Sequence, residues 1–356
     1  MKTCIILLLL TFILSNHAFA GDRIDKVTHQ LNTTLQCSNR IWPGLKKSSY
    51  RVLFVQPSTK ESWFWTAVSG KAENISESEF EVSANLPKYS FGQFRNERAV
   101  IINLDDVSEK SRIPSLNVDG AVSLAFHEGF HYLFQMKEPW VAQMTSVDRK
   151  SDLDHVTAVY FRRMLIRALR TELNSGNGFG RSSYWFQKWE ALGEAPETKL
   201  SDILEGTANY AEVIASVIAD KGCQVTEKDF LQTVTSNLDS VVGIPMDDGV
   251  MKELFTQYIA TGYQIEGYEI GLLSLLALRM RGISIGSNEF EMGRDFVSEI
   301  QSASTNAEKM KVMVDLQEAL GKVRTPAEIL LRSVAPAVDQ EDPTLLEFIR
   351  KASVSN

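Results

Sequence analysis

Hydrophobic and polar positions divide the chain into an early part with short apolar runs and a later part with a helical period. Between residues 50 and 106, segments rich in Val, Ile and aromatic side chains are separated by clusters of Gly, Pro, Asn and Ser. Such runs, bounded by turn residues, are typical of β-strands. A leading helix is expected at 22–38. The pattern predicts a small, mainly antiparallel sheet with strands at 50–57, 62–70, 79–86 and 98–106.

Beyond the last expected strand, apolar residues recur with the period of an amphipathic helix. Asp119 and Ser201 are expected N-caps of two of these helices, and "NSGNGFGRSS" at 174–183 is an expected flexible loop. The expected helices are 119–136, 152–174, 183–193, 200–221, 226–239, 246–260, 264–281, 288–303, 306–322, 325–334 and 343–352. The fold class is therefore α+β, with a β-rich part at 21–115 and a helical body at 116–352 that we expect to form one continuous unit with the sheet.

The first twenty residues resemble a secretory signal peptide. Lys2 precedes the apolar run "CIILLLLTFIL", and "AFA" at 18–20 is a small-residue cleavage signal. We therefore expect cleavage after Ala20 and a secreted or periplasmic protein. No later stretch is apolar for the ~18 residues that a membrane-spanning helix needs, so no integral membrane segment is expected after cleavage.

The charge balance and the cysteines limit the possible partners. The formal net charge is −8 and the sequence has no basic cluster, which argues against nucleic acid because phosphate binding needs concentrated Lys and Arg. After removal of the signal peptide, Cys37 and Cys223 are the remaining cysteines. In an oxidising compartment they form one disulfide or stay as two separate buried thiols, and the sequence leaves both possibilities open.

The stretch "AFHEGFHYLFQ" at 125–135 contains the pattern H-E-x-x-H. At ~100° per residue on a helix, His127 and His131 project together, well away from the main apolar stripe. Two imidazoles one turn apart point at a single ion, which is the geometry of a zinc site. The alternative is an ordinary helix with a polar edge. The apolar stripe consists of Val122, Ala125, Phe126, Gly129 and Leu133.

Zinc chemistry gives each of these residue types a role. Neutral imidazole is a good zinc ligand, and the metal lowers the pKa of water to about 7 and polarises a carbonyl. Glu128 lies beside the histidines and is the candidate general base. Gly129 is costly inside a helix, by ~1 kcal/mol relative to alanine, and indicates close packing of another helix against this one.

A catalytic zinc site needs a third protein ligand. The continuation of H-E-x-x-H that metzincins carry is absent after His131. His155 is one alternative, although it is expected in the first turn of a helix. The stretch "DILEGTANYAE" at 202–212 offers a better one, because Glu205, Asn209 and Glu212 share one helical face. That face is either a solvated polar surface or a ligand-bearing surface, with Asn209 placed to hydrogen-bond a ligating histidine.

"HEGFH" followed by "EGTANYAE" resembles the gluzincin branch of zinc metallopeptidases, which carry a ligand glutamate on a later helix. The resemblance covers about 150 residues and implies a zincin-like fold. It implies Zn²⁺ as the cofactor, His127, His131 and Glu205 as its ligands, and Glu128 as the general base.

Two features depart from the gluzincin pattern. The segment between residues 131 and 205 is longer than in compact members, and Asn209 stands where an aspartate is common.

Such enzymes need a hydrogen-bond donor for the oxyanion of the tetrahedral intermediate. "GYQIEGYEIG" at 262–271 offers Tyr263 and Tyr268, and the resemblance favours Tyr268, although both tyrosines could equally pack in the core.

The expected function is that of an exported zinc metallohydrolase, and specifically a peptidase acting on a peptide or protein substrate. The alternative is a non-catalytic exported protein for binding or envelope maintenance, built on a metallopeptidase-like scaffold. Such a protein either binds zinc without catalysing a reaction, or has neither zinc nor catalytic activity.

Overall fold

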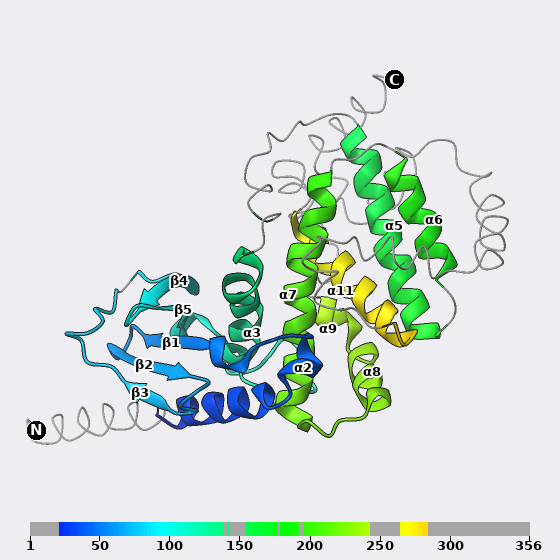
Figure 1. Ribbon diagram of the computed structural model, residues 1–356. Coiled ribbons are helices and arrows are strands. Elements are labelled where there is room, and N and C mark those ends of the chain that lie inside the picture. The colour runs from blue at the N-terminus through cyan, green and yellow to red at the C-terminus, as the bar shows by residue number, and fades with distance from the viewer. Residues whose placement is uncertain are drawn as a thin grey trace, which may run out of the picture. The chain divides into compact units, whose positions relative to one another are not determined.

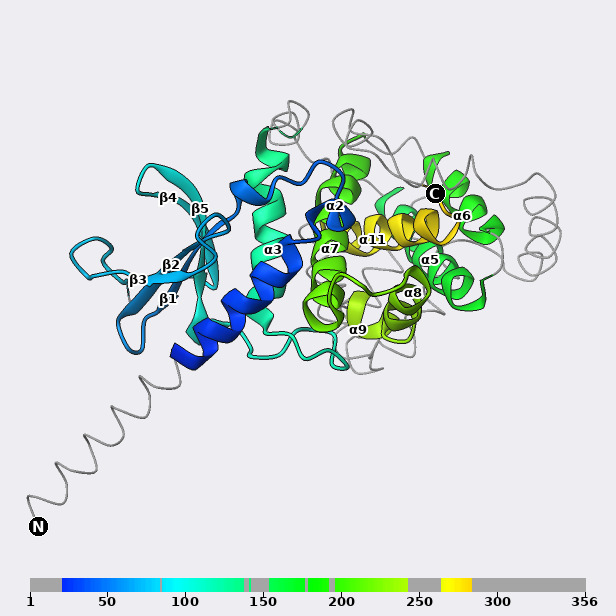
Figure 2. The same ribbon diagram turned by 60° about the horizontal axis from the view of Figure 1, so that its bottom comes forward.

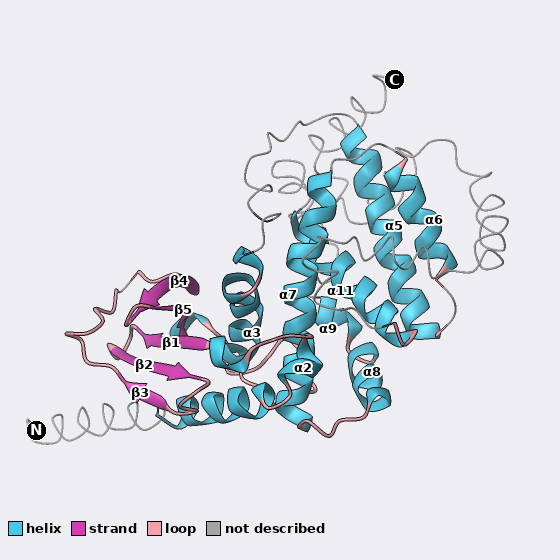
Figure 3. Cartoon of the chain, in the orientation of Figure 1, coloured by secondary structure: helices cyan, strands magenta, loops and turns pink. Residues whose placement is uncertain are grey.

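The computed structural model describes residues 21–83, 85–137, 141, 154–176, 179–191, 196–242 and 264–283 (Figure 1). It confirms an α+β protein with a five-stranded mixed sheet and a larger set of helices (Figure 3). The chain divides into two compact units, residues 1–138 with 211–237 and residues 139–210 with 238–356. Among the described helices, none combines the length and the apolar composition that a membrane crossing needs.

The sheet belongs to the first unit, and its strand order is β3-β2-β1-β5-β4. β1 and β5 are parallel, with Val52 opposite Val100, and the other three pairs are antiparallel. The expectation of a mainly antiparallel sheet is therefore confirmed. The strands are β1 (Arg51–Gln56), β2 (Glu61–Thr66), β3 (Ala72–Asn74), β4 (Tyr89–Phe94) and β5 (Glu97–Asn103).

One expected strand is wrong. The described residues of 79–86 form turns and irregular backbone, and the strand next to β5 is β4, which the sequence pattern missed. Phe80 and Leu86 nevertheless pack against a buried cluster on one face of the sheet that contains Leu53 and Val55. The apolar residues of this segment thus pack against the core from a loop.

The opposite face of the sheet packs against helix α3 (Gly120–Leu133). Side chains alternate along a strand, so Val52 and Phe54 point away from the Leu53 cluster and to the same side as Tyr50. The Tyr50 ring lies 5.2 Å from the ring of Phe126 on α3. α3 and the helix over residues 21–35 both run alongside the sheet (Figure 2).

A disulfide joins the two sequence segments that make up the first unit. Cys37 and Cys223 are bonded, with their Cα atoms 5.8 Å apart, which confirms the paired alternative. Arg40 donates a hydrogen bond to the carbonyl of Val225 over 2.8 Å. The remaining elements here are α2 (Ser38–Ile41), α8 (Glu227–Thr235), the second part of α7 (Pro196–Lys221) and the 3-10 helices η1 (Lys47–Ser49), η2 (Leu104–Asp106) and η3 (Gln135–Lys137).

The second unit is helical in its described part. It contains the first part of α7, together with α5 (Asp154–Ser175), α6 (Gly180–Glu190), α9 (Leu238–Val242) and α11 (Gln264–Met280). Arg162 and Asp202 form a buried ion pair of 2.6 Å, and the Arg162 guanidinium lies 4.8 Å from the ring centre of Trp189. Because the pair joins α5 to α7, loss of either partner would leave a buried charge uncompensated.

Several helix boundaries differ from the expected ones. Ser201 does not cap a helix, because α7 already begins at Pro196, where proline has no N–H to lose. The expected helix 226–239 is broken into α8 and α9, and the expected loop at 174–183 is shorter because α6 begins at Gly180. Five expected helices lie outside the described residues: 246–260, 288–303, 306–322, 325–334 and 343–352.

Two glycines allow α7 and α11 to cross in close contact. A Cβ atom on Gly206 would lie 2.3 Å from the Cα of Gly271, and one on Gly271 would lie 2.1 Å from the carbonyl oxygen of Asp202. Real side chains never approach backbone so closely, so only glycine fits at either position. Gly206, the residue after Glu205, therefore serves the close approach of the two helices.

We expect Gly206→Ala to destabilise the protein by about 1–3 kcal/mol, because overpacking forces the two backbones apart. Thermal unfolding followed by circular dichroism measures the effect. Gly21→Ala is the matched control, since nothing lies within 4 Å of its added Cβ. Equal unfolding temperatures for the two variants would contradict the close crossing.

Candidate metal centre

Helix α3 begins at a strongly anchored N-cap. The side chain of Asp119 accepts a hydrogen bond from the backbone N–H of Ala121 over 2.9 Å, as a capping residue does. Arg23 holds the same carboxylate with two nitrogens at 3.0 Å. The predicted cap at Asp119 is confirmed, and Arg23 ties the start of α3 to the helix over residues 21–35.

Packing on one side of α3 determines which side carries the histidines. A Cβ on Gly129 would lie 2.8 Å from the Tyr50 ring, and Phe126 and Phe130 are fully buried on the same side. Gly129 therefore accommodates an aromatic ring that precedes β1, whereas the sequence suggested another helix. The ring occupies the apolar stripe, so His127 and His131 project from a different face of α3.

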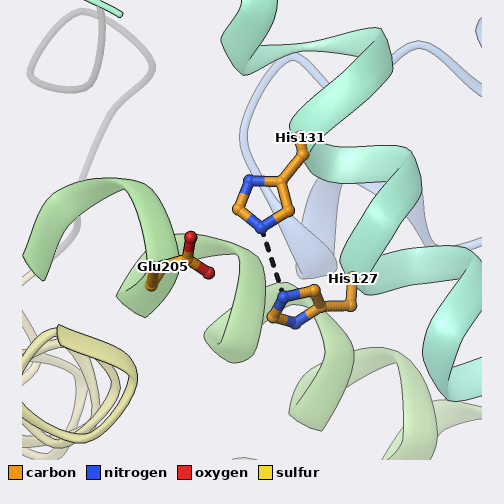
Figure 4. A group of neighbouring side chains, drawn as sticks. All are labelled: His127, His131 and Glu205. Atoms are coloured by element: carbon orange, nitrogen blue, oxygen red, sulfur yellow. Dashed lines mark hydrogen bonds between the residues drawn. The ribbon is translucent and has the colours of Figure 1, made fainter. Parts of the chain in front are cut away.

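His127 and His131 approach each other through their Nε2 atoms, which are 3.2 Å apart (Figure 4). Their ring centres are 4.9 Å apart and the rings are nearly perpendicular. His127 is buried, with 7% of its surface exposed, and His131 is partly exposed. One edge of the pair therefore remains accessible.

The Nδ1 atoms of both rings bind oxygen atoms. His127 Nδ1 lies 3.1 Å from Oε2 of Glu212, and His131 Nδ1 is hydrogen-bonded to Oε1 of Gln135. A carboxylate or amide oxygen only accepts, so each Nδ1 carries the proton and each Nε2 presents a lone pair. The two Nε2 atoms, 3.2 Å apart, are thus the ring nitrogens left to bind one shared cation.

The spacing suits a metal ion. Two zinc–nitrogen bonds of about 2.0–2.1 Å at a tetrahedral angle place the nitrogens about 3.3 Å apart, close to the 3.2 Å observed. Glu205 completes a group that could hold a metal ion, since one ligand atom from each of His127, His131 and Glu205 lies within 4.8 Å of the others (Figure 4). The donor set of two imidazoles and one carboxylate fits a metal of the zinc class.

Helix α7 positions Glu205. Glu212 lies two turns further along the same helix and contacts His127, and the Ser216 hydroxyl lies 2.9 Å from that of Ser123 on α3. These contacts place the second part of α7 against α3 within the first unit. Because the helix is continuous, Glu205 falls on the same face as Glu212, and it is partly exposed.

Arg112 holds the carboxylate of Glu212. Its Nε lies 3.1 Å from Oε1 of Glu212, whose other oxygen faces His127. Burial opposes ionisation of Glu212, but the charge of Arg112 and the hydrogen bond to His127 outweigh it, and the pKa of Glu212 lies below its ordinary value. Arg112, Glu212 and His127 thus form a chain that keeps the Nε2 lone pair of His127 directed at the metal position.

Asn209 was expected to hydrogen-bond a ligating histidine, and the hydrogen bond that the structure describes for it joins it to α11. It is fully buried, and its Nδ2 donates to the backbone carbonyl of Tyr268 over 3.0 Å. The Nδ1 atoms of the two histidines are bound by Glu212 and Gln135 instead. Asn209 therefore ties α7 to α11, and the imidazole-orienting carboxylate comes from Glu212, one turn further along.

For the other candidate residues the structure describes burial or a backbone contact, but no side-chain contact with the metal position. Glu128 is buried on α3 next to His127, with 5% of its surface exposed. Tyr268 is partly buried on α11 and its carbonyl accepts from Asn209, so its role as oxyanion donor stays a prediction. The side chains of His155 and Tyr263 lie outside the described residues.

Sequence reasoning missed Gln135 and Arg112. Gln135 is fully buried and lies four residues after His131. This spacing of one helical turn is the signal in the sequence that could have identified it. Arg112 lies in the irregular segment before α3, where no periodic signal exists.

No family model matches this chain, and no curated protein or solved structure matches it significantly. The donor set itself therefore carries the functional argument.

We expect Glu212→Ala to weaken zinc binding by about 10–100-fold, because the proton and orientation of His127 are no longer fixed. Competition with a chromophoric chelator measures the affinity. Glu81→Ala is a control at an exposed acid away from this site. An unchanged affinity in Glu212→Ala would show that the hydrogen bond to His127 has no influence on the metal.

Proposed function

We propose that the protein is an exported zinc-dependent metallohydrolase, specifically a gluzincin-type peptidase with a zincin-like catalytic unit. The observation that carries the proposal is the convergence of both histidine Nε2 atoms, 3.2 Å apart, with the Glu205 carboxylate within 4.8 Å. Peptides or proteins are the proposed substrates, in line with the resemblance of "HEGFH" and "EGTANYAE" to that family.

The ligand chemistry supports zinc over the other common cations. Calcium and magnesium prefer sets of oxygen ligands, whereas His127, His131 and Glu205 offer two nitrogens and one carboxylate. Three protein ligands leave one position open, as in catalytic zinc sites, while structural sites are closed by four. When bound, zinc supplies a Lewis acid that acidifies water and polarises a substrate carbonyl.

The protein's own residues then divide the remaining work. Glu212 and Gln135 accept from the Nδ1 atoms of His127 and His131, which leaves the Nε2 atoms as the nitrogens available to act as ligands. Glu128 is the proposed general base, which accepts a proton from water and delivers it to the leaving amine. Tyr268 is the proposed donor to the developing oxyanion.

Two features support export. The first twenty residues have the pattern of a cleavable signal peptide, and the Cys37–Cys223 disulfide is typical of proteins that fold in an oxidising compartment. We therefore propose cleavage after Ala20 and a secreted or periplasmic location.

Glu128→Gln tests the reaction and the metal separately. We expect about one zinc per chain in the parent and in the variant, because the amide does not disturb the two histidines. Hydrolysis of a broad peptide library should fall by at least about 100-fold, since an amide cannot carry a proton. Metal content is measured by plasma mass spectrometry, and cleavage by mass spectrometry of the products.

Glu81→Gln is the matched control for the same chemical change at an exposed site. Glu128→Gln with parental activity would contradict the role of Glu128. Zinc in the parent without cleavage of any peptide would favour a non-catalytic binding protein. A parent that takes up no zinc would remove the basis of the proposal.

A further inference from the structure

A second candidate site lies beside the C-terminal end of α3, next to the turn that precedes β1. A cavity of about 190 Å³ is lined by Gly44, Lys46, Ser49, Leu133, Phe134 and Lys137. We call these six residues the basic pocket. All of them belong to the first unit.

The turn before β1 brings one side of the basic pocket into place. Gly44 has a φ of 80°, a left-handed conformation that glycine adopts without strain. The chain then turns through η1, and Lys46 and Ser49 line the cavity together with Leu133 and Lys137. The two lysines therefore come from segments far apart in the sequence.

A third cation, Arg98 on β5, lies close to this pair. Its Nη2 contacts the Sδ of Met136 at 3.9 Å, and its guanidinium lies 4.0 Å from the ring centre of Tyr132. The pKa of Lys137 is lowered by partial burial and by the charges of Arg98 and Lys46. The charges of Arg98 and Lys46 thus both lie near enough to act on Lys137.

No acidic side chain of the described residues forms an ion pair with Lys46, Arg98 or Lys137. Four other arginines of the first unit have acidic partners in the described structure, whereas Arg40 donates to backbone carbonyl groups. The pairs are Arg23 with Asp119, Arg51 with Glu97, Arg95 with Glu73 and Glu79, and Arg112 with Glu212. In a chain with net charge −8, Lys46, Arg98 and Lys137 are thus three neighbouring cations that no acidic side chain of the described residues neutralises.

The end of α3 explains only part of this cluster. The free carbonyl groups at a helix C-terminus attract a nearby cation, and Lys137 follows α3 directly. Lys46 comes from the turn before β1 and Arg98 comes from β5. Each adds a further positive charge near a helix C-terminus whose carbonyl groups one cation already complements. A bound anion would convert this repulsion into attraction.

We propose that the basic pocket binds a phosphate group. Lysine ammonium groups and the Ser49 hydroxyl offer several donors to phosphate oxygens, and hydrogen bonds between ionised partners are the strongest of their kind. The phosphate belongs either to a small soluble compound or to the headgroup of an anionic lipid. The proposal is independent of the metal centre and of hydrolysis.

Inorganic phosphate is the first probe, with the full chain as the sample. At constant ionic strength set with chloride, phosphate should raise the unfolding temperature through the millimolar range, as expected for a dissociation constant on the order of 1 mM. Lys46→Ala and Lys137→Ala should each weaken phosphate binding by at least about tenfold, measured by calorimetry. Lys71→Ala, at an exposed lysine elsewhere, should bind like the parent.

The stability of the variants distinguishes a lost site from a lost fold. In phosphate-free buffer of low ionic strength, Lys46→Ala should unfold at the same temperature as the parent or higher, because repulsion is relieved. A lower unfolding temperature there would overturn the inference that the cluster is electrostatically strained. Absence of phosphate binding in the parent, or equal binding in all variants, would overturn the site.

Vesicles separate the two sources of the phosphate. Lysine-dependent binding to phosphatidylglycerol vesicles, without binding to phosphatidylcholine vesicles, would assign the pocket to a lipid headgroup. Phosphate binding without vesicle binding would assign it to a soluble compound. Metal content and peptide cleavage should be parental in Lys46→Ala in either case, so this proposal and the proposed function fail separately.

Discussion

The hydrogen bond between Nδ1 of His127 and the carboxylate of Glu212 is the interaction on which the candidate metal centre depends. It settles the tautomer of His127, so that the lone pair of Nε2 is directed at Nε2 of His131, 3.2 Å away. It also joins α3 to α7, the helix that carries Glu205. Without Arg112 to balance its charge, Glu212 would be a costly buried carboxylate at this position.

Close packing makes this polar arrangement possible. Tyr50 lies directly against Gly129 on the apolar side of α3, and Gly206 lies directly against Gly271 where α7 crosses α11. At these positions a larger side chain would push the neighbouring ring or backbone away, and the ligand distances would change with it. The glycines are thus part of the geometry of the site, although none of them touches a ligand atom.

The parts of the site that could be predicted from the sequence depend on the helical spacing of residues that lie close together in the chain. The projection of α3 predicted that His127 and His131 share a face, because both lie on one helix and one spacing decides their directions. On α7 the same reasoning placed Glu205 and Glu212 on one face, but it could not decide which carboxylate meets Nε2 and which meets Nδ1. That choice depends on where α7 crosses α3, which is a property of tertiary packing. Arg112 comes from irregular backbone, where no repeating signal exists.

The most direct test is anomalous diffraction from crystals of the protein grown with zinc, recorded above and below the zinc absorption edge. The account predicts one strong anomalous peak per chain within bonding distance of Nε2 of His127, Nε2 of His131 and a carboxylate oxygen of Glu205. The absence of a peak between the two histidines, or a peak there without Glu205 as a ligand, would contradict it.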